Sequence, residues 1–216
     1  MAVTIKSARE IELMREAGKM LNFTLRTLEK SIKPGMSTLD IDRIGEETIR
    51  SFGCVPSFLN YNGFPASICV SVNDEVVHGI PSKHRILKEG DIVSLDAGLI
   101  YKGYHADAAR TVAVGKISDE AQKLIDVTRE AFFEGVKYAK AGNHLNDICK
   151  AIGDYAESRG YGVVRDLIGH GIGTHLHEDP EVPNFDMRKR GIKLRPGMTL
   201  AIEPMINIGT WEVDWL

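Results

Sequence analysis

Residues 91–114 read DIVSLDAGLIYKGYHADAARTVAV, and this stretch is the part of the sequence that decides the fold. Two runs rich in β-branched and other apolar residues, Asp91 to Ile100 and Tyr104 to Val114, surround the pair Lys102-Gly103. Two such runs separated by a short, glycine-containing connection are typical of a β-hairpin. The stretch therefore predicts a long antiparallel hairpin.

Two carboxylates of this hairpin, Asp96 and Asp107, are expected on one face. If Lys102-Gly103 is a two-residue turn, residue 96 faces residue 109, and Asp107 lies two positions along, on the same face because side chains alternate with a period of two. A diagonal pair of this kind is separated by roughly 7–8 Å. The two charges repel unless a cation bridges them. The alternative is a pair of solvated acids on an exposed sheet face, but apolar neighbours such as Val93 and Leu95 favour a metal site.

The rest of the chain predicts helices grouped before strands, in the same order twice. We expect helices from Ser7 to about Ile32 and from Ser37 to about Phe52, a strand at Ile68–Val72 and a short return strand at Val76-Val77. After the hairpin, we expect helices at Ser118–Ala139 and Leu145–Ser158, a strand at Gly162–Ile168, a loop rich in glycine and histidine, and a strand at Thr199–Ile208. This order predicts an α+β fold with a curved, largely antiparallel sheet. It also predicts a single domain, residues 1–216, made of two similar halves, roughly 1–115 and 116–216.

Composition excludes several classes of protein. The 216 residues carry a formal net charge of −3 and lack a long run of one sign, so nothing indicates binding to nucleic acid or to a membrane surface. No apolar stretch approaches the ~20 residues of a membrane span, and the start, from Met1 to Lys6, does not resemble a signal peptide. Three scattered cysteines are too few for a disulfide framework or a thiolate metal site. We therefore expect a cytoplasmic protein with reduced thiols.

Two further residues could complete a metal site. His170 lies in the glycine-rich segment Gly169–Gly173, where the backbone can pass close to whatever the imidazole binds. Glu203 interrupts an apolar strand-like run, and a buried carboxylate there is costly unless it is paired or metal-bound. With Asp96 and Asp107 these residues supply carboxylate oxygens and one imidazole, a set that suits Mn²⁺, Fe²⁺, Co²⁺ or Zn²⁺. A carboxylate-rich site can hold two ions about 3.5–4 Å apart. We expect four of the other histidines to be structural: His84, His105, His144 and His175.

Five ordered segments, spread over about residues 5–209, resemble the type I methionine aminopeptidases of the bacterial kind, in the creatinase-like "pita-bread" superfamily. They are Ser71–Gly79, Asp91–Asp96, the segment around Asp107, Gly169–Gly173 with His177–Pro180, and Leu200–Pro204. The resemblance implies the pita-bread fold, with pseudo-twofold halves and helices on the outer face of the sheet. It implies removal of the initiator methionine from nascent proteins and peptides with a small second residue.

The resemblance also implies roles for particular residues. Asp96, Asp107, His170 and Glu203 would bind two divalent ions of the Co, Mn, Fe, Zn or Ni class. His78 and His177 would contact the substrate, and Glu203 would shuttle a proton. The methionine side chain would lie against five residues: Phe58, Tyr61, Phe64, Cys69 and Leu176. The family's partners would be nascent N-termini, with transient ribosome contact, and the protein would act as a monomer.

One feature of the family has no counterpart in the printed sequence. The family supplies a fifth ligand, a second glutamate on a final strand beyond Glu203, whereas this sequence ends at Leu216. The expectation from this difference is that Leu216 ends a fragment that lacks the C-terminal strand and is poorly active. Two other functions stay open at this point: a proline dipeptidase-like hydrolase of the same fold, and a non-catalytic binding module.

Overall fold

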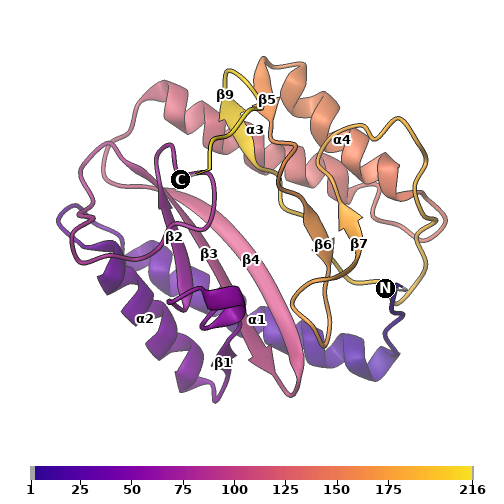
Figure 1. The fold of residues 1–216 in the computed structure, drawn as a ribbon, viewed down its shortest axis with the longest axis horizontal. Coiled ribbons are helices and arrows are strands. Elements are labelled where there is room, and N and C mark those ends of the chain that lie inside the picture. Colours follow the sequence, from indigo (N-terminus) through magenta and orange to yellow (C-terminus); the bar gives the residue numbers. More distant parts are fainter. Residues whose placement is uncertain (1–2, 216) are drawn as a thin grey trace. The chain divides into compact units, whose positions relative to one another are not determined.

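The structure is a computed structural model that describes residues 3–215, so the expectations attached to the Met1-Ala2 start and to Leu216 lie outside the described residues. The chain forms two compact units (Figure 1). We call Ala8–Ala121 with Gly173–Leu176 the hairpin unit. We call Gln122–Ile172 with the described residues of Met1–Ser7 and His177–Leu216 the histidine unit. Each unit is described by itself, and the prediction of two similar halves stays a prediction.

The hairpin unit contains two helices followed by an antiparallel sheet. Its elements are α1 (Ala8–Ser31), α2 (Thr38–Ser51), β1 (Val55–Pro56), the short 3₁₀ helix η1 (Tyr61–Gly63), β2 (Ile68–Val72), β3 (Ile92–Tyr101) and β4 (Tyr104–Ala113). Strand β3 is central, because β1, β2 and β4 all pair with it in antiparallel fashion. Ser37 caps α2 in a reciprocal capping box with Asp40.

The hairpin that the sequence predicts is confirmed. Tyr101 pairs with Tyr104, so Lys102 and Gly103 form a two-residue loop. Both have positive φ, 49° and 84°, as the favoured two-residue hairpin turns require. Asp96 faces Ala109, as expected.

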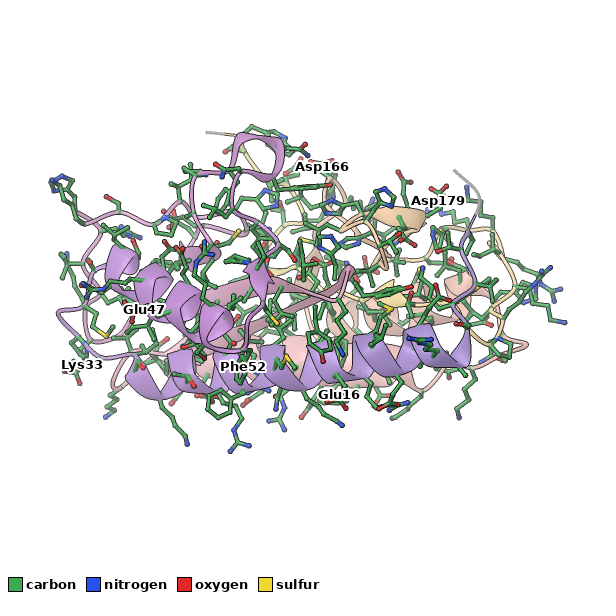
Figure 2. All side chains as sticks on the ribbon, turned by 90° about the horizontal axis from the view of Figure 1, so that it is seen from below. Glu16, Lys33, Glu47, Phe52, Asp166 and Asp179 are labelled. Atoms are coloured by element: carbon green, nitrogen blue, oxygen red, sulfur yellow. The ribbon has the colours of Figure 1, made fainter. Side chains whose placement is uncertain are left out.

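The core of this unit lies between the helices and one face of the sheet. Every second residue of β3 from Val93 to Leu99 is buried there, together with Leu21, Leu25 and Leu28 of α1 and with Ile41 and Ile49 of α2. Figure 2 shows Phe52, which packs against this core at the end of α2, and Glu47 on the exposed face of the same helix. Because this sheet face covers the core, the opposite face is left to carry Asp96 and Asp107.

The histidine unit repeats the order of helices before strands. It contains α3 (Asp119–Val136, whose first residues belong to the hairpin unit), α4 (Leu145–Glu157), β5 (Tyr161–Val163), β6 (Gly169–Gly171), β7 (Glu178–Val182), β8 (Leu200–Ala201) and β9 (Ile206–Ile208). The strands form two antiparallel sheets, β5-β9 and β7-β6-β8. Two buried clusters centre on Ile148 and Ile152 of α4 and on Val163 of β5.

Two of the predicted strands of this unit are wrong in extent. The expected strand Gly162–Ile168 is confined to Tyr161–Val163, and β6 then begins at Gly169, inside the expected loop. The expected strand Thr199–Ile208 is divided into β8 and β9, which belong to different sheets. Pro204 has no N–H to donate, so the apolar run around it cannot pair continuously.

The expected return strand at Val76-Val77 is also wrong, because that segment is irregular. The Glu75 carboxylate accepts a hydrogen bond from the Val72 N–H at 2.7 Å, and the returning chain meets β2 again at Gly79, whose carbonyl accepts from the Val70 N–H. The α+β class with antiparallel sheets is confirmed. Among the described residues, no helix combines the length and apolar character that crossing a membrane requires.

Candidate metal and substrate site

Asp96 and Asp107 occupy the sheet face of the hairpin unit that points away from its core. Asp96 pairs with Ala109 in the β3–β4 register and Asp107 pairs with Gly98, so the two carboxylates are diagonal neighbours, as expected. Both residues are half-buried. Two like charges so placed make a ready position for a cation.

A buried thiol shares this face. Cys69 pairs with Asp96 across β2 and β3 and is only 4% exposed. Burial raises the pKa of the Cys69 thiol, and the charges of Asp96 and Asp107 raise it further. Cys69 therefore stays a neutral, weakly polar side chain beside the carboxylates, which suits the wall of an apolar pocket better than a metal ligand.

Phe58 lies against the same part of β3. A Cβ on Gly98 would lie 2.8 Å from Cε1 of Phe58 and 2.9 Å from Cβ of Ser57, so the ring packs directly on the glycine that faces Asp107. The Ser57 N–H donates to the Gly98 carbonyl at 2.9 Å, and its hydroxyl is hydrogen-bonded to Nδ1 of His105 at 2.9 Å. Phe58, Asp96 and Asp107 are thus brought together.

The other predicted pocket residues fall in the same unit. Leu176 is buried at 3% exposure, and Tyr61 and Phe64, at the two ends of the η1 turn, are half-buried. The Phe64 N–H donates to the Tyr61 carbonyl at 2.9 Å, which keeps the turn short.

His78 stands in a tightly constrained backbone next to β2. Its φ is 58°, in the left-handed region that non-glycine residues rarely adopt. A Cβ at the following Gly79 would come within 2.3 Å of the Val70 carbonyl oxygen, and the Gly79 N–H donates to the Ser71 hydroxyl. Strained residues held this firmly are concentrated at functional sites.

In the histidine unit, the imidazole of His170 is fixed on the central strand β6. The residue is 8% exposed, and Nδ1 donates to the Gly171 carbonyl at 2.8 Å. In the neutral ring this assigns the lone pair to Nε2, which lies 3.2 Å from Oε1 of Glu203. The β-bulge between His170 and Gly171, where β6 and β7 shift register, aims the ring locally.

Glu203 reaches this imidazole from the irregular segment between β8 and β9. Its backbone carbonyl accepts a hydrogen bond from Nδ2 of Asn184 at 2.7 Å. Oε1 is buried, and within residues 3–215 it accepts no hydrogen bond. His177, just before β7, completes the group, because its ring centroid lies 4.2 Å from that of His170 in an edge-to-face arrangement.

Two donor atoms that share one cation at about 2.1 Å each must lie within about 4.2 Å of each other. The 3.2 Å between Nε2 of His170 and Oε1 of Glu203 satisfies this, and the buried oxygen gains the partner that its burial demands. Of the candidate ligands, Asp96 and Asp107 belong to the hairpin unit, and His170 and Glu203 belong to the histidine unit. Within the described part of the chain, no three His, Cys, Asp or Glu side chains gather as a metal site by themselves.

Sequence reasoning missed two residues that shape these groups. Phe58 packs against Gly98, and Asn184 holds the backbone at Glu203. Gly98 carried a sequence signal, as a glycine inside a strand pattern, whereas Asn184 became visible only once distant segments were brought together. His105 is hydrogen-bonded to Ser57, and its structural role stays a prediction.

Comparison with known proteins identifies close relatives. Residues 12–215 match the model of metallopeptidase family M24. The chain is 58% identical to the methionine aminopeptidase of Clostridium acetobutylicum over 218 residues, which cover 99% of this chain and 87% of that protein. It is similar to the crystal structure of the methionine aminopeptidase from Thermotoga maritima, with a TM-score of 0.96, 44% identity and coverage of 99% and 86%. The Xaa-Pro dipeptidase from Bacillus anthracis is less similar, with a TM-score of 0.81 and 31% identity, and the match covers 93% of this chain but 54% of that one.

Proposed function

We propose a residue-level account of how this chain, which belongs to metallopeptidase family M24 and within it to the methionine aminopeptidases, removes the initiator methionine from protein N-termini. The chain is a metal-dependent exopeptidase by that membership. The identity and number of the ions, and the role of each residue, are the proposal. The observation that carries it is the buried Oε1 of Glu203 lying 3.2 Å from the lone-pair nitrogen of His170.

The four ligands of the proposal are Asp96, Asp107, His170 and Glu203, and they would hold two divalent ions of the Co, Mn, Fe, Zn or Ni class. Three carboxylates and an imidazole make a hard, mostly oxygen donor set that fits such ions. Ions held by these residues would supply a water of lowered pKa and Lewis-acid polarisation of the scissile carbonyl. The neutral Cys69 thiol beside Asp96 leaves the carboxylates as the anionic donors of this sheet face.

Three side chains would move or stabilise charge during cleavage. Glu203 would accept the proton of the attacking water and pass it to the leaving amine, as a general base and then a general acid. His177 would donate a hydrogen bond to the carbonyl oxygen as negative charge develops there. His78 would contact the scissile amide and the amino end of the substrate, and its constrained backbone would keep it in place.

The methionine side chain would lie in a pocket formed by Phe58, Tyr61, Phe64, Cys69 and Leu176. Phe58, Cys69 and Leu176 are buried. The aromatic ring of Phe58 and the neutral thiol of Cys69 both make favourable contacts with a thioether. A pocket shaped for an unbranched side chain excludes branched ones by steric clash, and tight space beyond the cleaved bond favours a small second residue.

Cleavage of short peptides tests this assignment. Met-Ala-Ser should be cleaved far faster than Met-Leu-Ser or Leu-Ala-Ser, and X-Pro dipeptides should be poor substrates. Comparable kcat/KM values for the three tripeptides would contradict the pocket assignment. A preference for X-Pro dipeptides would favour the dipeptidase alternative, and failure to cleave any peptide with Mn²⁺ or Co²⁺ present would favour a binding module. We further propose that the protein acts as a cytoplasmic monomer on chains emerging from the ribosome.

A further inference from the structure

Lys6 is a lysine buried near the N-terminus of the chain. Its exposed fraction is 8%, although lysines are almost never buried unless they are paired. The pairing partner is Glu178: Nζ lies 2.5 Å from Oε2, and the two side chains are 6% and 7% exposed. The Thr4 hydroxyl donates to the same carboxylate oxygen at 2.5 Å and also contacts the Lys6 ammonium. The carboxylate of Glu178 is therefore tied to the N-terminal segment by two donors.

The backbone of Lys6 is attached to a second segment of the histidine unit. Its N–H donates to the Gly197 carbonyl at 2.8 Å. A Cβ at Gly197 would lie 2.5 Å from the Lys6 carbonyl oxygen, and the φ of Gly197 is +88°, so this close approach requires glycine. Lys6 thus contacts one segment through its side chain and another through its backbone.

These two segments lead directly into the two outer strands of the sheet that carries His170. Glu178 is the first residue of β7, where it pairs with Gly171, and Gly197 lies three residues before Leu200, the first residue of β8. Strand β6 lies between β7 and β8. The N-terminal segment therefore connects both neighbours of β6, and β8 in turn leads to Glu203.

The residue beside Glu178 is His177. Its ring contacts that of His170 edge to face, with 4.2 Å between centroids, although the residue itself is exposed and belongs to no strand. Glu178 follows His177 directly and begins β7, so the ion pair between Glu178 and Lys6 holds the backbone next to His177.

We propose that Lys6 is a positioning residue: by pairing with Glu178 and bonding to Gly197, it holds β7 and β8 against β6 and so fixes His177 beside His170. The inference rests on the proposed function, in which His177 stabilises charge on the substrate carbonyl. It assigns a task in that reaction to the N-terminal segment, which is attached to Glu178 and Gly197. A misplacement of a catalytic group by about 1 Å can lower a rate ~100-fold, so the loss of a distant positioning residue has a measurable effect.

The first test uses the metal-free protein and does not depend on activity. Lys6→Met keeps the length of the side chain and removes its charge. The matched control is Lys137→Met, because Lys137 forms an exposed ion pair with Glu134 in the same unit. Histidine side-chain NMR should show ring-current-shifted signals of His170 and His177 in the wild type and in Lys137→Met, and their collapse toward ordinary positions in Lys6→Met. Unchanged histidine signals in Lys6→Met would overturn the inference.

The second test is a kinetic cycle with His177, using Met-Ala-Ser and saturating Mn²⁺. We expect Lys6→Met to lower kcat roughly 10- to 100-fold with a smaller change in KM, because the lost contact belongs to the transition state. In a His177→Ala background the same substitution should lower kcat by less than about threefold, since residues that act through one another are non-additive. An equal loss of kcat in both backgrounds would show a merely structural role and refute the positioning role of Lys6. A wild-type kcat in His177→Ala would instead refute the proposed role of His177. The NMR result would still decide whether Lys6 positions His177.

A third variant separates positioning from stability. Lys6→Met removes the ammonium partner of the buried Glu178 carboxylate, which can destabilise the protein, whereas replacing both members of a buried ion pair by apolar residues is often tolerated. Lys6→Met/Glu178→Leu should therefore recover the thermal stability lost in Lys6→Met but should keep the reduced kcat. Recovery of kcat together with stability would overturn the inference.

Discussion

Substitution of Gly98 by alanine tests the pocket assignment most directly. The φ of Gly98 lies outside the left-handed region, so the backbone accepts alanine without strain. The added Cβ would lie 2.8 Å from Cε1 of Phe58 and 2.9 Å from Cβ of Ser57. Non-bonded carbons prefer a separation of about 3.5–4.0 Å. One of the two neighbours must therefore move by about 1 Å.

The hydrogen bonds around Gly98 decide which neighbour moves. Ser57 is held by its N–H bond to the Gly98 carbonyl and by its hydroxyl bond to His105, both at 2.9 Å. The Phe58 carbonyl accepts a hydrogen bond from the Tyr61 N–H, but its apolar ring has no hydrogen-bonding group and should rotate away from β3. Overpacking of this kind costs about 1–3 kcal/mol in stability. A displaced pocket wall should cost a comparable ~1–3 kcal/mol in transition-state binding, which lowers kcat/KM for Met-Ala-Ser about 5- to 150-fold.

The assay compares Gly98→Ala with Gly18→Ala in the same unit. An added Cβ at Gly18 has no heavy atom within 4 Å, and Gly18 lies inside α1, so this control should gain about 0.5–1 kcal/mol and keep full activity. Stability is measured by urea unfolding, peptide cleavage by kcat/KM, and Mn²⁺ binding by calorimetry, because Asp107 faces Gly98 across the hairpin. A loss of stability with unchanged kcat/KM would refute the placement of Phe58 in the pocket. Weakened Mn²⁺ binding would show instead that the substitution acts through the carboxylates.

Two further predictions concern charged and titrating groups. Asp107→Ala should abolish both Mn²⁺ binding and cleavage, because the remaining Asp96 loses the partner with which it would hold the ions. Unchanged affinity in a calorimetric titration with Mn²⁺ or Co²⁺ would contradict this. Burial raises the pKa of the Cys149 thiol to about 12, so the folded protein keeps a proton that the unfolded chain loses at lower pH. Stability should therefore fall as pH rises from about 9 toward 12, by up to ~1.4 kcal/mol per pH unit for this group. Urea unfolding of the wild type and Cys149→Ala should show a shallower pH dependence in the variant, and equal slopes would refute the assignment.

The sequence predicted most reliably those parts in which local chemistry and tertiary packing agree. The hairpin register follows from a turn whose residues both accept positive φ and from an alternation with one buried face. Residue 96 therefore faces residue 109 as expected, and the same-face placement of Asp96 and Asp107 follows from it. The helices before and after the hairpin were equally predictable, because a continuous apolar stripe defines each of them.

The strands of the histidine unit were predicted poorly, for a reason visible at Glu203. Sequence periodicity treats Thr199–Ile208 as one strand, but Pro204 removes a ladder donor and the two ends of the run join different sheets. His170 was expected in a loop, whereas it lies on a three-residue strand whose neighbours, β7 and β8, come from later segments. Whether such short segments form strands depends on pairing partners that are distant in the sequence and that local patterns do not reveal.

The errors in secondary structure fall at the residues to which the proposal gives chemical roles. A continuous strand through Glu203 would alternate its side chains between two faces and pair every backbone group within one sheet. Because the strand is interrupted here, the Glu203 carbonyl accepts its hydrogen bond from the Asn184 side chain, and the Glu203 carboxylate lies near Nε2 of His170. At His170 a β-bulge similarly breaks the register with β7. Regular pairing would satisfy more backbone hydrogen bonds, but the alternation of the strand would then determine the directions of the His170 and Glu203 side chains. The bulge at His170 and the interruption at Glu203 allow other directions. Failures of strand prediction at such positions are therefore expected at functional residues.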